Sequence, residues 1–98
     1  MSFAGGSYEE VSRWVHNFLT SHAKREDVHA EVELESGDAR EGKSYGARFR
    51  LGGQVSSLTD LDYRTVADHR GELQWCRDLA ARTRASVKDL GRSVARPA

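Results

Sequence analysis

The longest helical pattern in the chain is VADHRGELQWCRDLAARTRASVKDL, residues 66–90. Apolar and small side chains recur in it at alternating steps of three and four, so a helix would place them on one face. We call this face the core stripe: Val66, His69, Leu73, Cys76, Ala80, Thr83, Val87 and Leu90. The pattern predicts a long C-terminal helix, bent or restarted near Gly71 because glycine disfavours a helix interior. Gly91 is its predicted C-terminal cap.

The same helix carries basic side chains on a second face. At about 100° per residue they form a basic ridge of Arg70, Arg77, Arg84 and Lys88, which Arg82, Arg92 and Arg96 extend. A row of cations can follow nucleic-acid phosphates. However, Asp78 and Asp89 lie on the same helix, and no aromatic residue stands within the ridge to stack on a base. The ridge is therefore interpreted as a solvated helix face, an acidic-protein contact or a nucleic-acid contact.

Trp75 lies off the centre of the core stripe, and Leu79 follows it one helical turn later. Tryptophan is enriched in the cores of protein interfaces. The ordinary explanation is packing at the edge of the core against Trp14 of the N-terminal helix. The functional hypothesis is a partner-binding site formed by Trp75, Leu79 and Arg82.

Two further patterns predict an N-terminal helix and a β-hairpin. Ser7 and Glu10 fit a capping box, and the spacing that follows predicts a helix from Tyr8 to His22 or Lys24. Residues 28–35 and 45–51 alternate between apolar and polar side chains, as in strands with one buried face. The register favoured by charge pairs Glu31 with Arg50, Val32 with Phe49, Glu33 with Arg48 and Leu34 with Ala47, around a four-residue loop at 39–42.

The region 54–65 allows two interpretations. Residues 61–65 alternate like a third strand, whereas Thr59 or Asp60 can cap a helix that runs directly into the C-terminal one. We expect a short turn or irregular segment at 56–63. A hairpin alone is marginally stable and leaves unpaired edges, so either 54–65 supplies a third strand or two copies join edge to edge. The predicted fold class is α+β, with both helices on one face of the sheet.

Composition indicates one globular domain over 1–98, with flexible tails at 1–6 and 92–98, because 38% of the 98 residues are hydrophobic and 31% are charged. No segment approaches the roughly 18 apolar residues of a membrane span. The N-terminus also lacks the charged and apolar regions of a signal peptide. We therefore expect a cytoplasmic protein that does not bind membranes.

Charge is balanced in total but segregated along the chain. Fifteen basic and fifteen acidic residues give a formal net charge of zero. The charged residues of 26–38 are all acidic, whereas most of those after 70 are basic. Such segregated charges can compensate each other within the fold, or attract a second copy or another partner.

No motif in the chain predicts catalysis or metal binding. The histidines His16, His22, His29 and His69 do not have metal-ligand spacing, and the single cysteine, Cys76, lies within a predicted helix. Glycine-rich phosphate loops are also missing. We therefore expect no cofactor, no metal and no enzymatic activity.

These patterns predict a small non-catalytic protein-interaction module that associates with itself, as a homodimer, or with another protein. The predicted contact is Trp75, Leu79 and Arg82. The alternative is nucleic-acid binding through Arg70, Arg77, Arg84 and Lys88.

Overall fold

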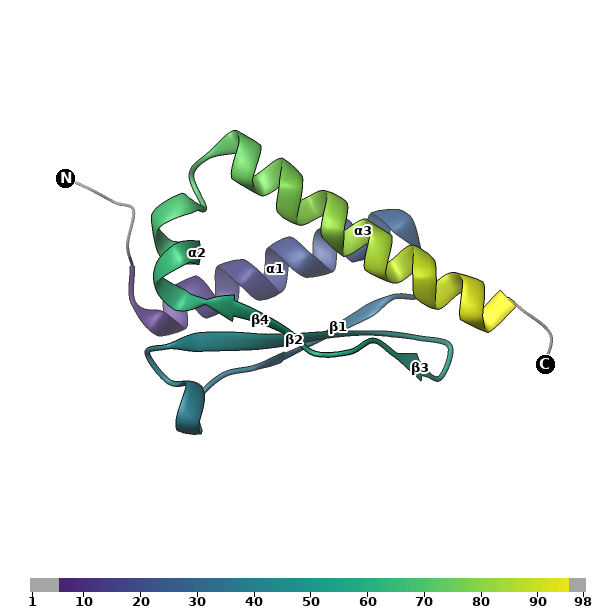
Figure 1. Cartoon of the computed structure of the whole chain (residues 1–98), viewed down its shortest axis with the longest axis horizontal. Coiled ribbons are helices and arrows are strands. Elements are labelled where there is room, and N and C mark those ends of the chain that lie inside the picture. Colours follow the sequence, from purple (N-terminus) through teal and green to yellow (C-terminus); the bar gives the residue numbers. More distant parts are fainter. Residues whose placement is uncertain (1–5, 96–98) are drawn as a thin grey trace.

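The computed structural model describes residues 6–95 and places the α-helices on one face of an antiparallel sheet (Figure 1). In chain order the elements are α1 (Tyr8–Glu26), β1 (Glu31–Glu35), the 3-10 turn η1 (Asp38–Arg40), β2 (Ser44–Leu51), β3 (Gln54–Val55), β4 (Thr59–Asp62), α2 (Tyr63–His69) and α3 (Leu73–Ala95). The predicted α+β fold class is confirmed. The predicted tails were 1–6 and 92–98. Residues 92–95 instead belong to α3, and residues 1–5 and 96–98 lie outside the described residues.

Helix α1 begins as predicted and ends later than predicted. The Ser7 hydroxyl accepts a hydrogen bond of 3.1 Å from the Glu10 amide, as an N-cap should. The helix continues to Glu26 because Ala23 is still fully buried against the core. A turn at Asp27 follows, in which Val28 is 70% exposed, so the first strand begins at Glu31 and not at residue 28.

The predicted register of the hairpin is confirmed. Strands β1 and β2 pair Glu31 with Arg50, Val32 with Phe49, Glu33 with Arg48 and Leu34 with Ala47. The ion pairs, however, run diagonally: Arg48 contacts Glu35 at 2.7 Å, and Arg50 contacts Glu33. Long side chains on a twisted sheet reach diagonal neighbours, so the backbone register and the ion pairing differ by two residues.

The hairpin loop is longer than the predicted four residues. The ladder between β1 and β2 stops at Glu35 and Gly46, and residues 36–43 form the connection that contains η1. Arg40 folds back from this loop and lies 2.7 Å from Asp60 and 3.6 Å from Glu35. The loop therefore covers part of the outer sheet face, the one turned away from the helices.

The expected irregular segment at 56–63 is correct only for 56–58, because residues 59–62 form β4. The alternative of further strand structure within 54–65 is therefore confirmed. After a glycine turn, β3 pairs with the end of β2, and β4 pairs with the beginning of β2. The turn forms because Gly52 and Gly53 both adopt positive φ, which suits a tight hairpin. Asp62 ends β4 and caps α2 by accepting a hydrogen bond of 2.9 Å from the Thr65 amide.

The long C-terminal helix is restarted rather than bent. Helix α2 ends at His69, and α3 begins at Leu73 after a sharp change of direction (Figure 1). Gly91 does not cap the helix, since α3 continues to Ala95 and Gly91 packs toward Leu51 of β2. The assignment of Leu73 to the core stripe is wrong, because Leu73 lies in the first turn of α3 and is 66% exposed. The buried members are Val66, Ala80, Thr83, Val87 and Leu90.

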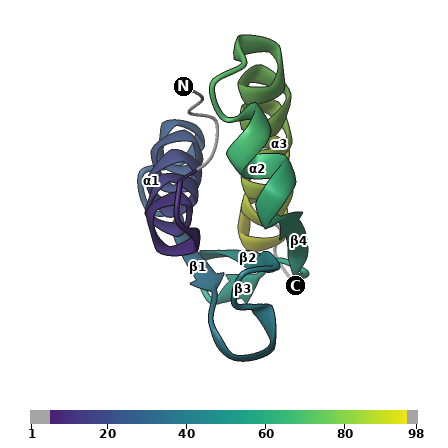
Figure 2. The same ribbon diagram turned by 90° about the vertical axis from the view of Figure 1, so that its left-hand side faces the viewer.

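Figure 2 shows α1 and α3 side by side above the sheet; α2 lies in front of α3 in this view and contacts α1 and β4. Helix α1 contacts β1, and α3 contacts β2 and β3, so the core lies between the helices and the inner face of the sheet. None of the helices within residues 6–95 has the length and apolar composition that crossing a membrane requires.

Candidate interaction surface

Five partly exposed rings from all three helices form an aromatic cluster: Trp14, Phe18, His22, His69 and Trp75. Trp14 stacks on Phe18 within α1 at a centroid distance of 4.8 Å, and it meets Trp75 of α3 at 6.3 Å. The predicted packing of Trp75 against Trp14 is therefore confirmed. Since each ring keeps part of its surface exposed, the cluster is a core edge that also presents aromatic surface to solvent.

A pocket of about 460 Å³ lies between α1 and α3 beside this cluster. We call it the helix groove; its lining is Phe18, His22, Leu73, Cys76, Arg77, Ala80 and Arg84. Leu73 leaves two-thirds of its surface in water, which is unusual for a large aliphatic side chain that adjoins aromatic rings. The groove thus combines an apolar floor with an exposed leucine.

Two arginines of the predicted basic ridge line the helix groove. Arg77 and Arg84 are exposed, and neither takes part in an ion pair among the described residues. The acidic hairpin does not neutralise them, because Glu33 and Glu35 pair with arginines of the hairpin and its loop on the outer sheet face. The groove therefore has a positive rim above an apolar floor.

His22 is a groove residue that the sequence pattern did not identify. Its Nδ1 atom is buried and has no hydrogen-bond partner among the described atoms. Burial lowers the pKa of this imidazole, and the positive charges of Arg25 and Arg84 lower it further. These effects favour the neutral form of His22. An anion bound in the groove would oppose them and raise the pKa of His22. Sequence spacing carries no signal for this, because it depends on α1 and α3 meeting.

The rest of the basic ridge is divided among other places. Arg70 lies at the C-cap of α2, and its guanidinium points toward Gly6, so it does not continue the ridge on α3. Lys88 lines a separate depression with Glu26 and Asp27 at the far ends of the two helices. Of the four alternative nucleic-acid residues, only Arg77 and Arg84 meet in one site.

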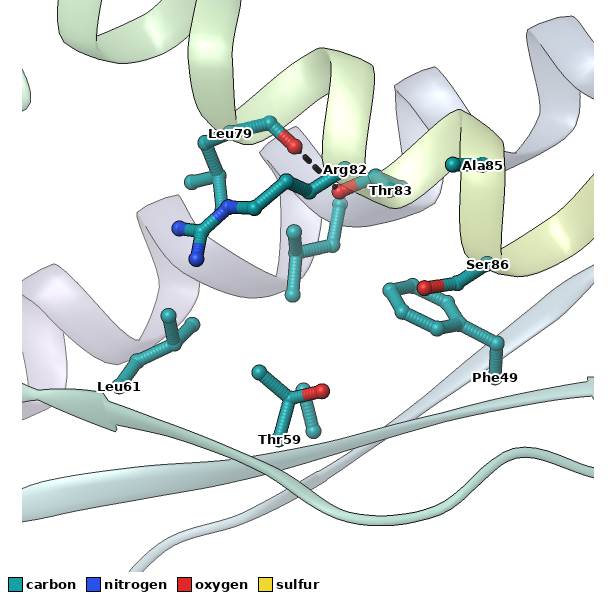
Figure 3. A pocket seen from close by; sticks show the side chains of 10 residues that line it. Phe49, Thr59, Leu61, Leu79, Arg82, Thr83, Ala85 and Ser86 are labelled. Carbon is teal, nitrogen blue, oxygen red and sulfur yellow. Dashed lines mark hydrogen bonds between the residues drawn. The ribbon is translucent and has the colours of Figure 1, made fainter.

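The predicted partner site of Trp75, Leu79 and Arg82 does not form one surface. Leu79 is 4% exposed and belongs to the core, which contradicts its predicted part in a partner-binding surface. Leu79 and Arg82 line a different pocket between α3 and the sheet (Figure 3), whereas Trp75 is in the aromatic cluster. The reason is that α3 packs on the sheet through a buried face wider than the predicted stripe.

Cys76 has an unreactive environment. Its Sγ lies 3.3 Å from the Arg70 carbonyl oxygen, and burial together with the nearby Glu72 carboxylate raises the pKa of the thiol. Within residues 6–95, no three His, Cys, Asp or Glu side chains are grouped so that they could hold a metal ion.

Comparison with protein-family models, with curated proteins and with solved structures finds no match for this chain. The functional argument therefore depends on the geometry described above.

Proposed function

We propose that this chain is a small non-catalytic protein-interaction module that binds a partner segment at the helix groove and the adjoining aromatic cluster. The observation that carries the proposal is Leu73, an aliphatic side chain left two-thirds exposed at the edge of a groove lined by Phe18 and two arginines. Burial of this apolar surface by a partner would be favourable, since apolar area removed from water contributes about 25 cal/mol per Å².

The composition of the surface supports this proposal. Tryptophan, phenylalanine and arginine are enriched at the energetic centres of protein interfaces. Here Trp14, Phe18 and Trp75 contribute partly exposed rings, and Arg77 and Arg84 contribute the cationic rim.

The charge of the rim indicates the chemistry of the partner. Arg77 and Arg84 have no carboxylate partner among the described residues, so a complementary segment should bring acidic side chains together with apolar ones. We therefore propose an acidic, amphipathic segment of another protein as the occupant.

Self-association stays a prediction. A homodimer was predicted because a two-stranded sheet would leave unpaired edges. In the structure, β3 and β4 pair with the second edge of β2. The free edge of β1 carries Glu31, Glu33 and Glu35, and an antiparallel pair of such edges would set Glu against Glu. The proposal therefore favours a different protein as partner, and a solution mass measurement tests the homodimer.

The test uses a displayed library of short random peptides selected against the whole chain. The proposal predicts that enriched peptides carry Asp or Glu next to Leu, Phe or Trp, and that Leu73→Glu weakens their binding about tenfold or more. Fluorescence anisotropy of labelled peptides measures the affinity.

Val28→Glu is the matched control, because Val28 is similarly exposed but lies in the turn after α1. It should leave peptide affinity unchanged. The proposal would be contradicted if Leu73→Glu left the peptide affinity unchanged, or if Val28→Glu weakened it equally.

Nucleic-acid binding is the second candidate, because Phe18 of α1 lines the same groove as Arg77 and Arg84 of α3. An aromatic ring beside a pair of guanidinium groups is an arrangement that can stack a base and hold a phosphate. This candidate predicts oligonucleotide binding that falls steeply between about 50 and 200 mM salt. Anisotropy with single- and double-stranded probes measures it, and an absence of binding at the lower salt removes the candidate.

The proposal also includes a cytoplasmic location. The free thiol of Cys76 is consistent with a reducing compartment. Cell fractionation tests this part of the proposal.

A further inference from the structure

A second pocket, which we call the sheet pocket, lies on the opposite side of α3 from the helix groove. It occupies about 290 Å³ between α3 and the strands β2 and β4 (Figure 3). Its floor is made of core side chains, among them Leu19, Phe49, Leu61 and Leu79. The floor is therefore apolar.

Short side chains on both walls create this space. Thr83, Ala85 and Ser86 of α3 stand opposite Ala47 of β2 and Thr59 of β4. None of these residues is long enough to fill the distance between a helix and a strand. The Thr83 hydroxyl donates to the Leu79 carbonyl at 2.9 Å, so its one donor hydrogen is used within its own helix.

One end of the sheet pocket is cationic. Figure 3 shows the Arg82 side chain reaching from α3 toward Leu61 and Thr59, while Phe49 lies at the other end. Arg82 is exposed and forms no ion pair among the described residues. Asp60, next to Thr59 on β4, pairs with Arg40 at 2.7 Å, and Asp78, one turn before Arg82 on α3, accepts a hydrogen bond from Gln74.

We propose that the sheet pocket binds a small amphipathic carboxylate. The carboxylate would accept two parallel hydrogen bonds from the planar guanidinium group of Arg82. The Thr59 hydroxyl, on the strand side of the pocket, would supply a further donor. The apolar tail would lie over Leu61 and Leu79 toward Phe49.

Volume and charge define the ligand more closely. An apolar cavity of about 150 Å³ holds one benzene, so a pocket about twice as large has room for roughly a dozen non-hydrogen atoms. One arginine and one hydroxyl match a single negative charge, whereas a phosphate dianion would leave charge uncompensated. A medium-chain fatty acid or an arylalkanoic acid has this size and charge.

The experiment titrates octanoate into the whole chain and follows backbone amide shifts by NMR. Two matched probes accompany it: 1-octanol, which has the tail without the charge, and acetate, which has the charge without the tail. The proposal predicts shifts at Phe49, Leu61 and Leu79 with octanoate, weaker affinity for 1-octanol and none for acetate.

Two variants locate the site. Arg82→Gln should weaken octanoate about tenfold and leave the 1-octanol affinity unchanged. Ser86→Phe, which places a ring in the pocket beside Phe49, should remove both ligands. Arg92→Gln is the control and should leave both affinities unchanged, because Arg92 is an exposed arginine of the same helix that lines neither the sheet pocket nor the helix groove.

Several outcomes would overturn the proposal. Equal affinities for octanoate and 1-octanol, or octanoate binding that is indifferent to Arg82→Gln, would exclude a carboxylate site. Shifts confined to Trp14, Leu73 and Trp75 would mean that the ligand covers the aromatic surface instead. No binding of octanoate, combined with insertion of an apolar peptide side chain, would assign the sheet pocket to a protein partner.

Discussion

The outer face of the sheet and the helix groove are both charged, but only the first is neutralised by its own neighbours. On the outer face, Glu33 and Glu35 meet Arg50 and Arg48 across the hairpin, and Arg40 bridges to Asp60. In the groove, Arg77 and Arg84 face aromatic and aliphatic side chains. A net charge of zero therefore conceals one compensated face and one face whose cations are available to a partner.

The sequence leaves two explanations open for its segregated charge, and each applies to a different region of the molecule. Compensation within the fold applies to the acidic hairpin, because the arginines that neutralise it come from the same strands and loop. It does not apply to Arg77 and Arg84, because they belong to α3 and line the helix groove. Helix α3 covers the opposite face of the sheet (Figure 2).

The largest expected effect separates a core leucine from a surface leucine on α3. Leu79→Ala should lower the free energy of unfolding by about 2–3 kcal/mol, since Leu79 is buried but borders an existing space. Leu73→Ala should change it by less than about 0.5 kcal/mol. Urea unfolding followed by tryptophan fluorescence measures both.

Equal losses for the two variants would mean that Leu73 packs in the core, and the helix groove would lose its exposed apolar residue.

A smaller effect is expected on the inner face of β2, where Tyr45 donates a hydrogen bond of 2.8 Å to the Tyr8 carbonyl. Tyr45→Phe should cost about 1 kcal/mol, and the cost should not depend on salt. Burial raises the pKa of the Tyr45 phenol above its ordinary value near 10. The folded state therefore keeps this proton, and its stabilisation is complete below pH 10 and lost as the pH rises further.

The measurement is urea unfolding across an alkaline series at two salt concentrations. A cost for Tyr45→Phe that shrinks with salt would place this residue among the surface electrostatic contacts.

The smallest stability effect should come from His22. Its folded pKa lies below the ordinary value of 6.5, so its stabilising contribution is present above that value and is lost as the pH falls through the folded pKa. His22→Gln should flatten this acidic limb. An acidic ligand in the groove should raise the pKa of His22, so binding should tighten from pH 7.5 to pH 5.5.

NMR titration of the imidazole, with and without a selected acidic peptide, checks this prediction. A His22 pKa that the peptide leaves unchanged would place the peptide elsewhere.

Local patterns predicted the hairpin well because one alternation and one set of opposite charges specify the same register. Glu31 opposite Arg50 and Leu34 opposite Ala47 agree with each other, so a shift by one residue would lose both. Strand β4 was harder to predict, because three of its four residues are exposed and two of them are aspartates. Only its pairing with β2 makes it a strand.

The candidate site was predictable only in part. The contact of Trp75 with Trp14 follows from two apolar helix faces, and the structure confirms it. The burial of Leu79 and the exposure of Leu73 depend on how α3 restarts and tilts across the sheet, which no spacing encodes. The meeting of His22 with Arg84 likewise requires α1 and α3 to be placed together.

The central claim is best tested by removing two arginine charges from each face and comparing the two double variants. The chain carrying Arg48→Gln and Arg50→Gln is compared with the chain carrying Arg77→Gln and Arg84→Gln, for unfolding free energy and for affinity toward a selected acidic peptide. The account predicts that the first pair loses stability, by up to about 1 kcal/mol per ion pair, and keeps the peptide. The second pair should keep its stability and lose the peptide. A first pair that loses the peptide while the second retains it would contradict the account.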